Sequence, residues 1–300
     1  MLPIAIHRLV YRLSPAFVRT RLKDLTPFGV NRFSLILPNG QTLIFDHSEC
    51  SKILRRFAWK HIHGYEPYTI RLFHALARRA FGVLDIGAYF GLYALIAAKT
   101  NPKAIVHAFE PVPQNLELLR HFLELNNCAH VFVHPIAIAR ESGNATLYIP
   151  DQRKSALPPT GSLKNCFLPG ERFGGRSAQA VQVRTKPLDS MIEEEFIRHI
   201  DLVKIDTEET EHDVILSGEK MFQSYRPDIV MEIIFCNPHV AEALAFLRKL
   251  GYRFFHIDPS GLSPFDEHRP SYGKQNGATE DLVYCEIFCT CRADSDLPRY

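Results

Sequence analysis

Several features are scarce or absent in this chain of 300 residues, and each absence excludes a class of protein. No apolar run approaches the roughly 18 residues that a membrane-spanning helix needs. Neither sign of charge predominates, because 35 lysines and arginines stand against 33 aspartates and glutamates. The resulting net charge of +2 gives no electrostatic reason to expect a nucleic acid as partner. The dinucleotide fingerprint G-x-G-x-x-G is also missing, which disfavours a nicotinamide-linked oxidoreductase.

The seven cysteines include no C-x-x-C pair. Cys285, Cys289 and Cys291 share one face of a predicted strand, which could suggest a thiolate cluster. One extended strand holds such residues too far apart to surround a zinc ion. We therefore interpret them as small buried apolar residues and predict no metal site. Unpaired thiols are typical of a reducing compartment, so we expect a cytoplasmic protein.

The first 80 residues predict an N-terminal cap. Residues 1–24 mix apolar side chains with arginines but lack the continuous apolar core and the cleavage site of a secretory signal. This basic, amphipathic pattern permits peripheral membrane contact, although we favour a helix that packs on the domain. Residues 32–46 predict a β-hairpin because Asn39-Gly40 is a typical turn pair. A helical pattern follows over residues 59–80.

From residue 81 onward, short apolar runs alternate with helical patterns. Strands are predicted at residues 82–86, 104–109, 130–138, 145–149, 181–185, 202–206 and 228–234. Helices are predicted at residues 91–99, 113–125, 188–198, 211–224 and 239–250. This alternation predicts a doubly wound, mostly parallel α/β sheet in one domain, residues 81–300. Two last strands, 252–257 and 282–290, have no helix between them, which predicts an antiparallel C-terminal edge.

The alternation is interrupted over residues 150–180, which are rich in proline, glycine, serine and lysine. Long segments without regular structure inside a compact domain are usually functional or disordered. We interpret this insertion as a substrate lid, and a plain surface loop is the alternative.

The most informative segment is residues 83–91, which predict a buried strand, an acid and a glycine turn that opens a helix. Its glycines, Gly87 and Gly91, are spaced G-x-x-x-G, and Tyr89 replaces the middle glycine of a dinucleotide site. Asp85, before the turn, would repel a pyrophosphate but attract a cationic amino acid group. This glycine spacing and this acid suit S-adenosylmethionine better than NAD. The alternative is an ordinary turn that happens to contain two glycines.

Acids also end later strands. Glu110 follows the second strand, where a carboxylate can accept hydrogen bonds from both ribose hydroxyls. The alternative interpretation of Glu110 is that it only interacts favourably with the dipole at the N-terminus of the next helix. Asp206 ends the fourth strand of the predicted sheet and is a further pocket candidate.

The residues next to Asp206 are charged as well. Acids at the start of the next helix are favourable with or without a ligand; these are Glu208, Glu209 and Glu211. Lys204 lies in a run that should be buried on both faces. A buried lysine needs an acidic partner. The candidate partners are Asp206, Glu208 and Glu232.

Taken together, these residues resemble the FkbM-type methyltransferases, which are S-adenosylmethionine-dependent O-methyltransferases of small molecules and glycans. The resemblance covers residues 81–256. It rests on residues 84–88, 108–111, 115–126, 203–206 with Glu208 and Glu211, 229–233 and 250–252. It implies a class I methyltransferase sheet, Rossmann-like in its winding, and S-adenosylmethionine as the cofactor.

Carried over position by position, the resemblance implies roles for individual residues. The methionine end of the cofactor would meet Asp85, Gly87 and Gly91, with Tyr89 in the same turn. Glu110 would hold the ribose, and Ala137 would lie beside the adenine. The substrate side would be bordered by Asp206 and Glu208. Asp206 is the first candidate for catalytic base or positioning residue, followed by Glu208 and His212.

Three residues depart from the family pattern. Phe90 stands where an asparagine is usual, Glu209 where a glycine is usual, and Thr210 where an alanine is usual. A glycine in place of Glu209 would permit close approach of the backbone to a ligand.

The sequence thus predicts an S-adenosylmethionine-dependent methyltransferase acting on a hydroxyl of a glycan, lipid or secondary metabolite. A non-catalytic cofactor-binding protein of the same fold is the alternative. An NAD-linked oxidoreductase is disfavoured further because no Tyr-x-x-x-Lys dyad follows the first turn.

Overall fold

The computed structural model describes residues 4–22, 30–46, 52–150, 162–163, 178–195, 197–234, 239–266 and 284–300. The N-terminal elements are α1 (Ile4–Leu13), α2 (Ala16–Leu22), β1 (Arg32–Ile36), β2 (Thr42–Asp46), α3 (Lys52–Lys60), η1 (His61–Gly64) and α4 (Pro67–Ala77). Next come β3 (Gly82–Ile86), α5 (Leu92–Thr100), β4 (Ile105–Phe109), α6 (Pro113–Leu125), β5 (Phe132–His134), β6 (Ala137–Ile138), β7 (Gly143–Pro150), β8 (Ala178–Lys186) and α7 (Leu188–Glu194). The chain continues through β9 (Leu202–Ile205), α8 (Glu211–Ser217), α9 (Glu219–Tyr225), β10 (Asp228–Ile234), α10 (Val240–Lys249), β11 (Arg253–Asp258), β12 (Gly261–Pro264), β13 (Tyr284–Thr290) and η2 (Asp294–Asp296).

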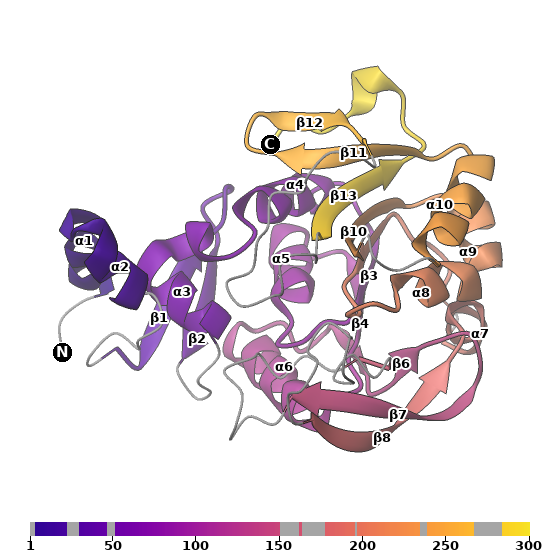
Figure 1. Cartoon of the computed structure of the whole chain (residues 1–300), viewed down its shortest axis with the longest axis horizontal. Coiled ribbons are helices and arrows are strands. Elements are labelled where there is room, and N and C mark those ends of the chain that lie inside the picture. The colour runs from indigo at the N-terminus through magenta and orange to yellow at the C-terminus, as the bar shows by residue number, and fades with distance from the viewer. Residues whose placement is uncertain are drawn as a thin grey trace.

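Eight strands form the main sheet in the order β12-β11-β13-β10-β9-β3-β4-β5. The strands from β10 to β5 pair in parallel. Successive side chains alternate between two cores, so that Val83 packs on one face and Leu84 on the other. Helices α4, α5 and α6 lie on one side of the sheet and α8, α9 and α10 on the other (Figure 1). The predicted doubly wound, mostly parallel α/β sheet is confirmed.

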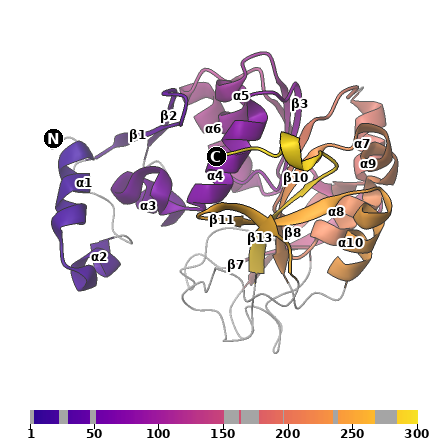
Figure 2. The same cartoon turned by 90° about the horizontal axis from the view of Figure 1, so that it is seen from above.

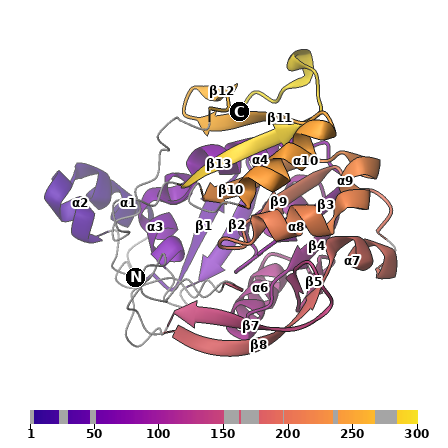
Figure 3. The same cartoon turned by 45° about the vertical axis from the view of Figure 1, so that its right-hand side comes forward.

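The predicted antiparallel C-terminal edge is confirmed, because β12, β11 and β13 lie together at one side of the main sheet and pair antiparallel. β13 is antiparallel to both of its neighbours, as expected for its direction. It does not lie at the edge, because it inserts between β10 and β11 (Figure 3). The edge is formed by β12, a short hairpin partner of β11 that the sequence pattern did not predict. The inserted position explains why Ile287, Phe288 and Cys289 are fully buried.

One predicted strand and one predicted helix each form two separate elements in the structure. The strand expected at residues 130–138 splits into β5 and into β6, which belongs to a separate sheet of order β6-β8-β7. Pro135 separates the two, and proline cannot donate to a strand ladder. The helix expected at residues 211–224 breaks into α8 and α9 at Gly218, where a Cβ would come within 2.8 Å of Leu188 Cδ2. Most of the predicted lid, residues 151–161 and 164–177, lies outside the described residues.

The predicted hairpin is confirmed as β1 and β2, and it shares a core with the main sheet. The Phe45 ring lies 5.9 Å from the Phe90 ring and 5.1 Å from the Phe122 ring. Asn126 fixes the same strand, because it accepts the Ile44 N–H at 2.7 Å and donates to the Ile44 carbonyl at 2.8 Å. Phe90, one departure from the family pattern, therefore joins the hairpin to the sheet. The division into a cap and a catalytic domain at residue 80 stays a prediction.

Helices α1 and α2 occupy one end of the molecule, remote from α9 and α10 (Figures 1 and 2). Within the part of the chain that the structure describes, no helix is long and apolar enough to cross a membrane.

Candidate active site

A cavity of about 560 Å³ is lined by residues at the carboxyl ends of β3, β4 and β9. The strand order reverses there, because β4 lies on one side of β3 and β9 on the other. Open α/β sheets bind their ligands at this kind of switch point. The volume is that of a small-molecule or cofactor site, roughly 300–1,000 Å³.

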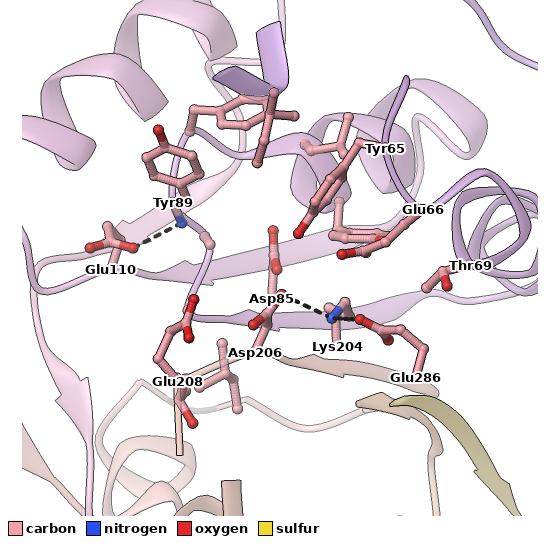
Figure 4. A pocket seen from close by; sticks show the side chains of 18 of the residues that line it. Tyr65, Glu66, Thr69, Asp85, Tyr89, Glu110, Lys204, Asp206, Glu208 and Glu286 are labelled. Carbon is pink, nitrogen blue, oxygen red and sulfur yellow. Dashed lines mark hydrogen bonds and ion pairs between the residues drawn. The ribbon is translucent and has the colours of Figure 1, made fainter. Parts of the chain in front are cut away.

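The wall of this cavity is strongly acidic. Its carboxylates are Glu66, Asp85, Glu110, Asp206, Glu208, Asp258 and Glu286, and its lysines and arginines are Lys52, Arg56 and Lys204. The acids come from elements far apart in the sequence and lie around one space (Figure 4). This excess of carboxylates favours a ligand that carries positive charge.

Asp85 lies at the floor of the cavity, near the end of β3, and is 1% exposed. Its Oδ2 accepts the Ala94 N–H of α5 at 2.8 Å. Burial raises the pKa of Asp85 to about 7, although this hydrogen bond and the nearby Lys204 act in the opposite direction. The carboxylate thus gains or loses a proton near neutral pH.

Glu110 follows β4 and is held by three hydrogen bonds. Its Oε2 accepts the Tyr89 N–H at 2.8 Å, which links it to the glycine turn (Figure 4). Its Oε1 accepts the Val112 N–H at 2.8 Å and the Asn115 amide at 3.2 Å. Burial raises the pKa of Glu110 to about 7. The structure therefore brings Glu110 and Asp85 into one cavity.

The two glycines of the turn have different neighbours. Gly87 has φ +82°, and a Cβ there would lie 1.8 Å from the Asp206 carbonyl oxygen. The close approach at Gly87 is thus to the backbone that directly follows β9. Gly91 has φ +84°, and a Cβ would lie 2.2 Å from Leu119 Cδ1. The N–H of Gly91 donates to the Ala88 carbonyl at 2.7 Å, so this N–H is used inside the turn.

Not every predicted cofactor residue reaches the cavity wall. Tyr89 and Ala137 line it, together with Asp85, Gly87 and Glu110. Gly91 is not among the described residues that do so, and it acts through packing behind the wall. The two predicted catalytic residues, Asp206 and Glu208, both line the cavity.

Lys204 is fully buried and makes two ion pairs. Its Nζ lies 3.3 Å from Asp206 Oδ2 and 3.3 Å from Glu286 Oε1 (Figure 4). Burial alone would lower the pKa of Lys204, but Asp206, Glu286 and Glu66 raise it well above its usual value. The predicted pairing with Asp206 is confirmed, and Glu286 is an additional partner.

Glu66 and Glu286 were not predicted as site residues. Glu66 directly precedes α4, and its Oε2 accepts the Tyr93 hydroxyl at 2.6 Å. Burial raises the pKa of Glu66 and that of Glu286. Carboxylate oxygens of Glu66, Asp206 and Glu286 lie within 4.8 Å of one another. A charged residue in the apolar run 283–289 is a signal that could have revealed Glu286.

The loop after Asp206 has left-handed backbone at two positions, with φ +53° at Glu208 and +82° at Glu209. Glu211 stabilises this loop, because its Oε1 accepts the Thr207 N–H at 2.9 Å and the Glu209 N–H at 3.2 Å. The usual glycine of the family thus corresponds to a backbone conformation that glycine adopts without strain. Glu209 holds the same conformation with a side chain.

The chain is similar in sequence to known methyltransferases. A family profile described as the Methyltransferase FkbM domain matches residues 85–254. Methyltransferase sdnD of Sordaria araneosa is 27% identical over 203 residues, which cover 61% of this chain and 76% of the relative. The 31-O-demethyl-FK506 methyltransferase FkbM of Streptomyces tacrolimicus is 26% identical over 239 residues, which cover 73% and 88%. A crystal structure of methyltransferase FkbM from Methylobacillus flagellatus aligns at 14% identity and a TM-score of 0.42, over 79% of this chain and 53% of that one.

Proposed function

Because the chain belongs to the FkbM methyltransferase family, we propose that it is an S-adenosylmethionine-dependent O-methyltransferase. The proposed acceptor is a hydroxyl of a glycan, a lipid or a secondary metabolite. One observation carries the proposal: two buried carboxylates, Asp85 and Glu110, lie at the carboxyl ends of adjacent parallel strands and line a single acidic cavity.

The cavity fits S-adenosylmethionine in charge and in hydrogen bonding. Asp85 and the turn at Gly87 and Tyr89 would hold the cationic amino acid end. Glu110 would accept hydrogen bonds from the ribose hydroxyls, and Ala137 offers an apolar surface for the adenine. Both carboxylates have pKa values raised to about 7 by burial, so a cationic ligand would complete their ionisation. When bound, the cofactor supplies an electrophilic methyl group on a sulfonium.

The acceptor side is formed by Asp206 and Glu208. Methyl transfer to oxygen requires that the hydroxyl be aligned, and alignment can contribute about 7–11 kcal/mol at best. The hydroxyl proton also needs an acceptor. The ion pair with Lys204 holds the Asp206 carboxylate at the cavity wall, where it can orient the hydroxyl or accept its proton. The name of the Streptomyces relative specifies a 31-O-demethyl substrate, which supports oxygen as the acceptor atom.

A second candidate function is cofactor binding without turnover. The observation that favours it is Glu209, which occupies a left-handed position where the family usually has glycine. Intact cofactor binding without methylated product on any acceptor fraction would support this candidate.

The proposal includes a cytoplasmic location. It is supported by Cys128 and Cys289, which form no disulfide within the described residues and are buried in the cores.

The test is a transfer assay with methyl-labelled S-adenosylmethionine and separate lipid, glycan and small-molecule fractions as acceptors. The wild type should label one fraction. Asp206→Asn should still bind the cofactor and lose turnover by about 10²- to 10⁴-fold, the range of general acid–base catalysis. Asp213→Asn is the matched control, because Asp213 of α8 pairs with Arg140 and does not line the cavity. Full turnover by Asp206→Asn would show that the catalytic assignment is wrong.

A further inference from the structure

Helix α1 is fixed to the protein by one of its faces. The rings of His7 and Tyr11 lie 5.8 and 5.9 Å from the ring of Trp59 in α3. On the same side, Arg8 donates to the Ala58 carbonyl at 3.0 Å and to the Ser34 carbonyl at 2.9 Å. These contacts determine which face of the helix points outward.

The outward face of α1 is apolar. Four residues at helical spacing form it, with exposed fractions of 40% for Ile6, 55% for Leu9, 51% for Val10 and 77% for Leu13. Phe17 in α2 extends the surface and is 73% exposed. Of the nine large apolar side chains that are exposed in the described residues, five lie on these two helices. Such a concentration marks an interaction site.

The charged side chains of α1 and α2 are all arginines. Residues 4–22 contain no aspartate or glutamate. Arg12 lies in α1, Arg19 and Arg21 lie in α2, and Arg12 and Arg21 are exposed. A helix with an apolar face flanked by arginines is suited to the interface of an anionic lipid layer. A second copy of the chain would instead bring arginines against arginines across a two-fold axis.

We propose that α1 and α2 dock on an anionic lipid surface. The apolar residues of the outward face enter the headgroup region, and the arginines contact lipid phosphates. The two helices stand at one end of the molecule, so a flat surface can reach them without displacing the sheet (Figures 1 and 2). α3 connects this surface with the cavity, because Trp59 packs on α1 while Lys52, Ile53 and Arg56 line the cavity. This inference does not depend on the proposed methyl transfer.

The test is flotation of the full-length chain with two kinds of vesicle. One is phosphatidylcholine alone, and the other contains a substantial fraction of phosphatidylglycerol. Wild-type protein should float only with the second kind and should be released by high salt. Leu9→Ser with Leu13→Ser should weaken binding at least about tenfold, because burial of leucine side chains is lost.

The charge component has its own variant. Arg12→Gln with Arg21→Gln should weaken binding roughly thirtyfold, from about fivefold for each arginine near an anionic surface. The matched control is Phe81→Ser with Ile105→Ser, because these apolar side chains are 53% and 56% exposed on another part of the molecule. Circular dichroism and a thermal melt establish that every variant is folded.

Loss of flotation in both helix variants, with the control unchanged, supports the proposal. It is overturned if the wild type fails to float with phosphatidylglycerol vesicles, or if the control loses binding to the same degree. It is also overturned if sedimentation shows a dimer that the leucine variant dissociates while vesicle binding is absent, since the surface would then join two copies.

Discussion

Lys204→Met removes the cation at the centre of the acidic cluster while retaining a side chain of similar length. In the wild type the ammonium lies 3.3 Å from carboxylate oxygens of both Asp206 and Glu286. Without it, the carboxylates of Glu66, Asp206 and Glu286 face one another within 4.8 Å. Two unit charges at that separation of 4.8 Å repel by about 3.5 kcal/mol at an effective dielectric constant of about 20. Removing one partner of a buried ion pair typically lowers stability by about 3–5 kcal/mol, and we expect a loss in this range.

The loss should depend on pH in a defined direction. The pKa values of Glu66 and Glu286 are raised by burial, and removal of the lysine raises them further. A group whose folded pKa lies above its unfolded value stabilises the protein below the unfolded pKa, and this contribution is lost as pH rises through the folded value. Lys204→Met should therefore be most destabilised at about pH 8 and recover toward about pH 5, where the carboxylates take up protons.

Urea denaturation followed by circular dichroism at both pH values measures the effect. Lys220→Met is the matched control, because Lys220 makes a 3.2 Å ion pair with Glu193 and both side chains are largely exposed. Exposed pairs contribute about 0–1 kcal/mol. The account of the cluster is refuted if Lys204→Met loses no more stability than Lys220→Met, or if its loss is the same at both pH values.

Three further predictions concern residues of the site. Gly87→Ala should abolish cofactor binding or folding, because its Cβ would lie 1.8 Å from a carbonyl oxygen. The control is Gly251→Ala, at φ +89° with no atom within 4 Å, which should lower the free energy of unfolding by only about 1–2 kcal/mol in a denaturation experiment. Glu209→Gly should be more stable than Glu209→Ala in a thermal melt, by roughly 1 kcal/mol, because both lose the carboxylate and only glycine relieves the φ of +82°. Affinity for S-adenosylhomocysteine should rise from about pH 6 to about pH 8, since Asp85 and Glu110, with pKa values near 7, ionise and attract its ammonium. In Asp85→Asn, calorimetry should show a weaker rise.

The sequence predicted those parts of the site that follow local rules. Asp85, Glu110 and Asp206 stand where strands end, so parallel pairing alone brings them to one edge of the sheet. The need of Lys204 for an acidic partner followed from its place in a buried run, and its ion pair with Asp206 confirms that reasoning.

Other parts depend on contacts that no local pattern encodes. Glu286 reaches the site because β13 inserts between β10 and β11. The length and hydrophobicity of a strand do not determine whether it lies inside the sheet or at its edge. Glu66 reaches it because α4 packs on α5, where Tyr93 donates its hydroxyl to the Glu66 carboxylate. The close packing of Gly91 against Leu119 of α6 likewise joins segments that are far apart in the sequence.

We propose that the cavity binds S-adenosylmethionine through Glu110. Isothermal titration of S-adenosylhomocysteine and of NAD into the wild type and into Glu110→Gln tests it most directly. We predict that S-adenosylhomocysteine binds the wild type and that NAD does not. Glu110→Gln should weaken S-adenosylhomocysteine binding by roughly 10- to 150-fold, because a hydrogen bond to a charged group contributes about 1.5–3 kcal/mol. Binding of NAD in place of S-adenosylhomocysteine, or S-adenosylhomocysteine affinity unchanged in Glu110→Gln, would contradict the claim.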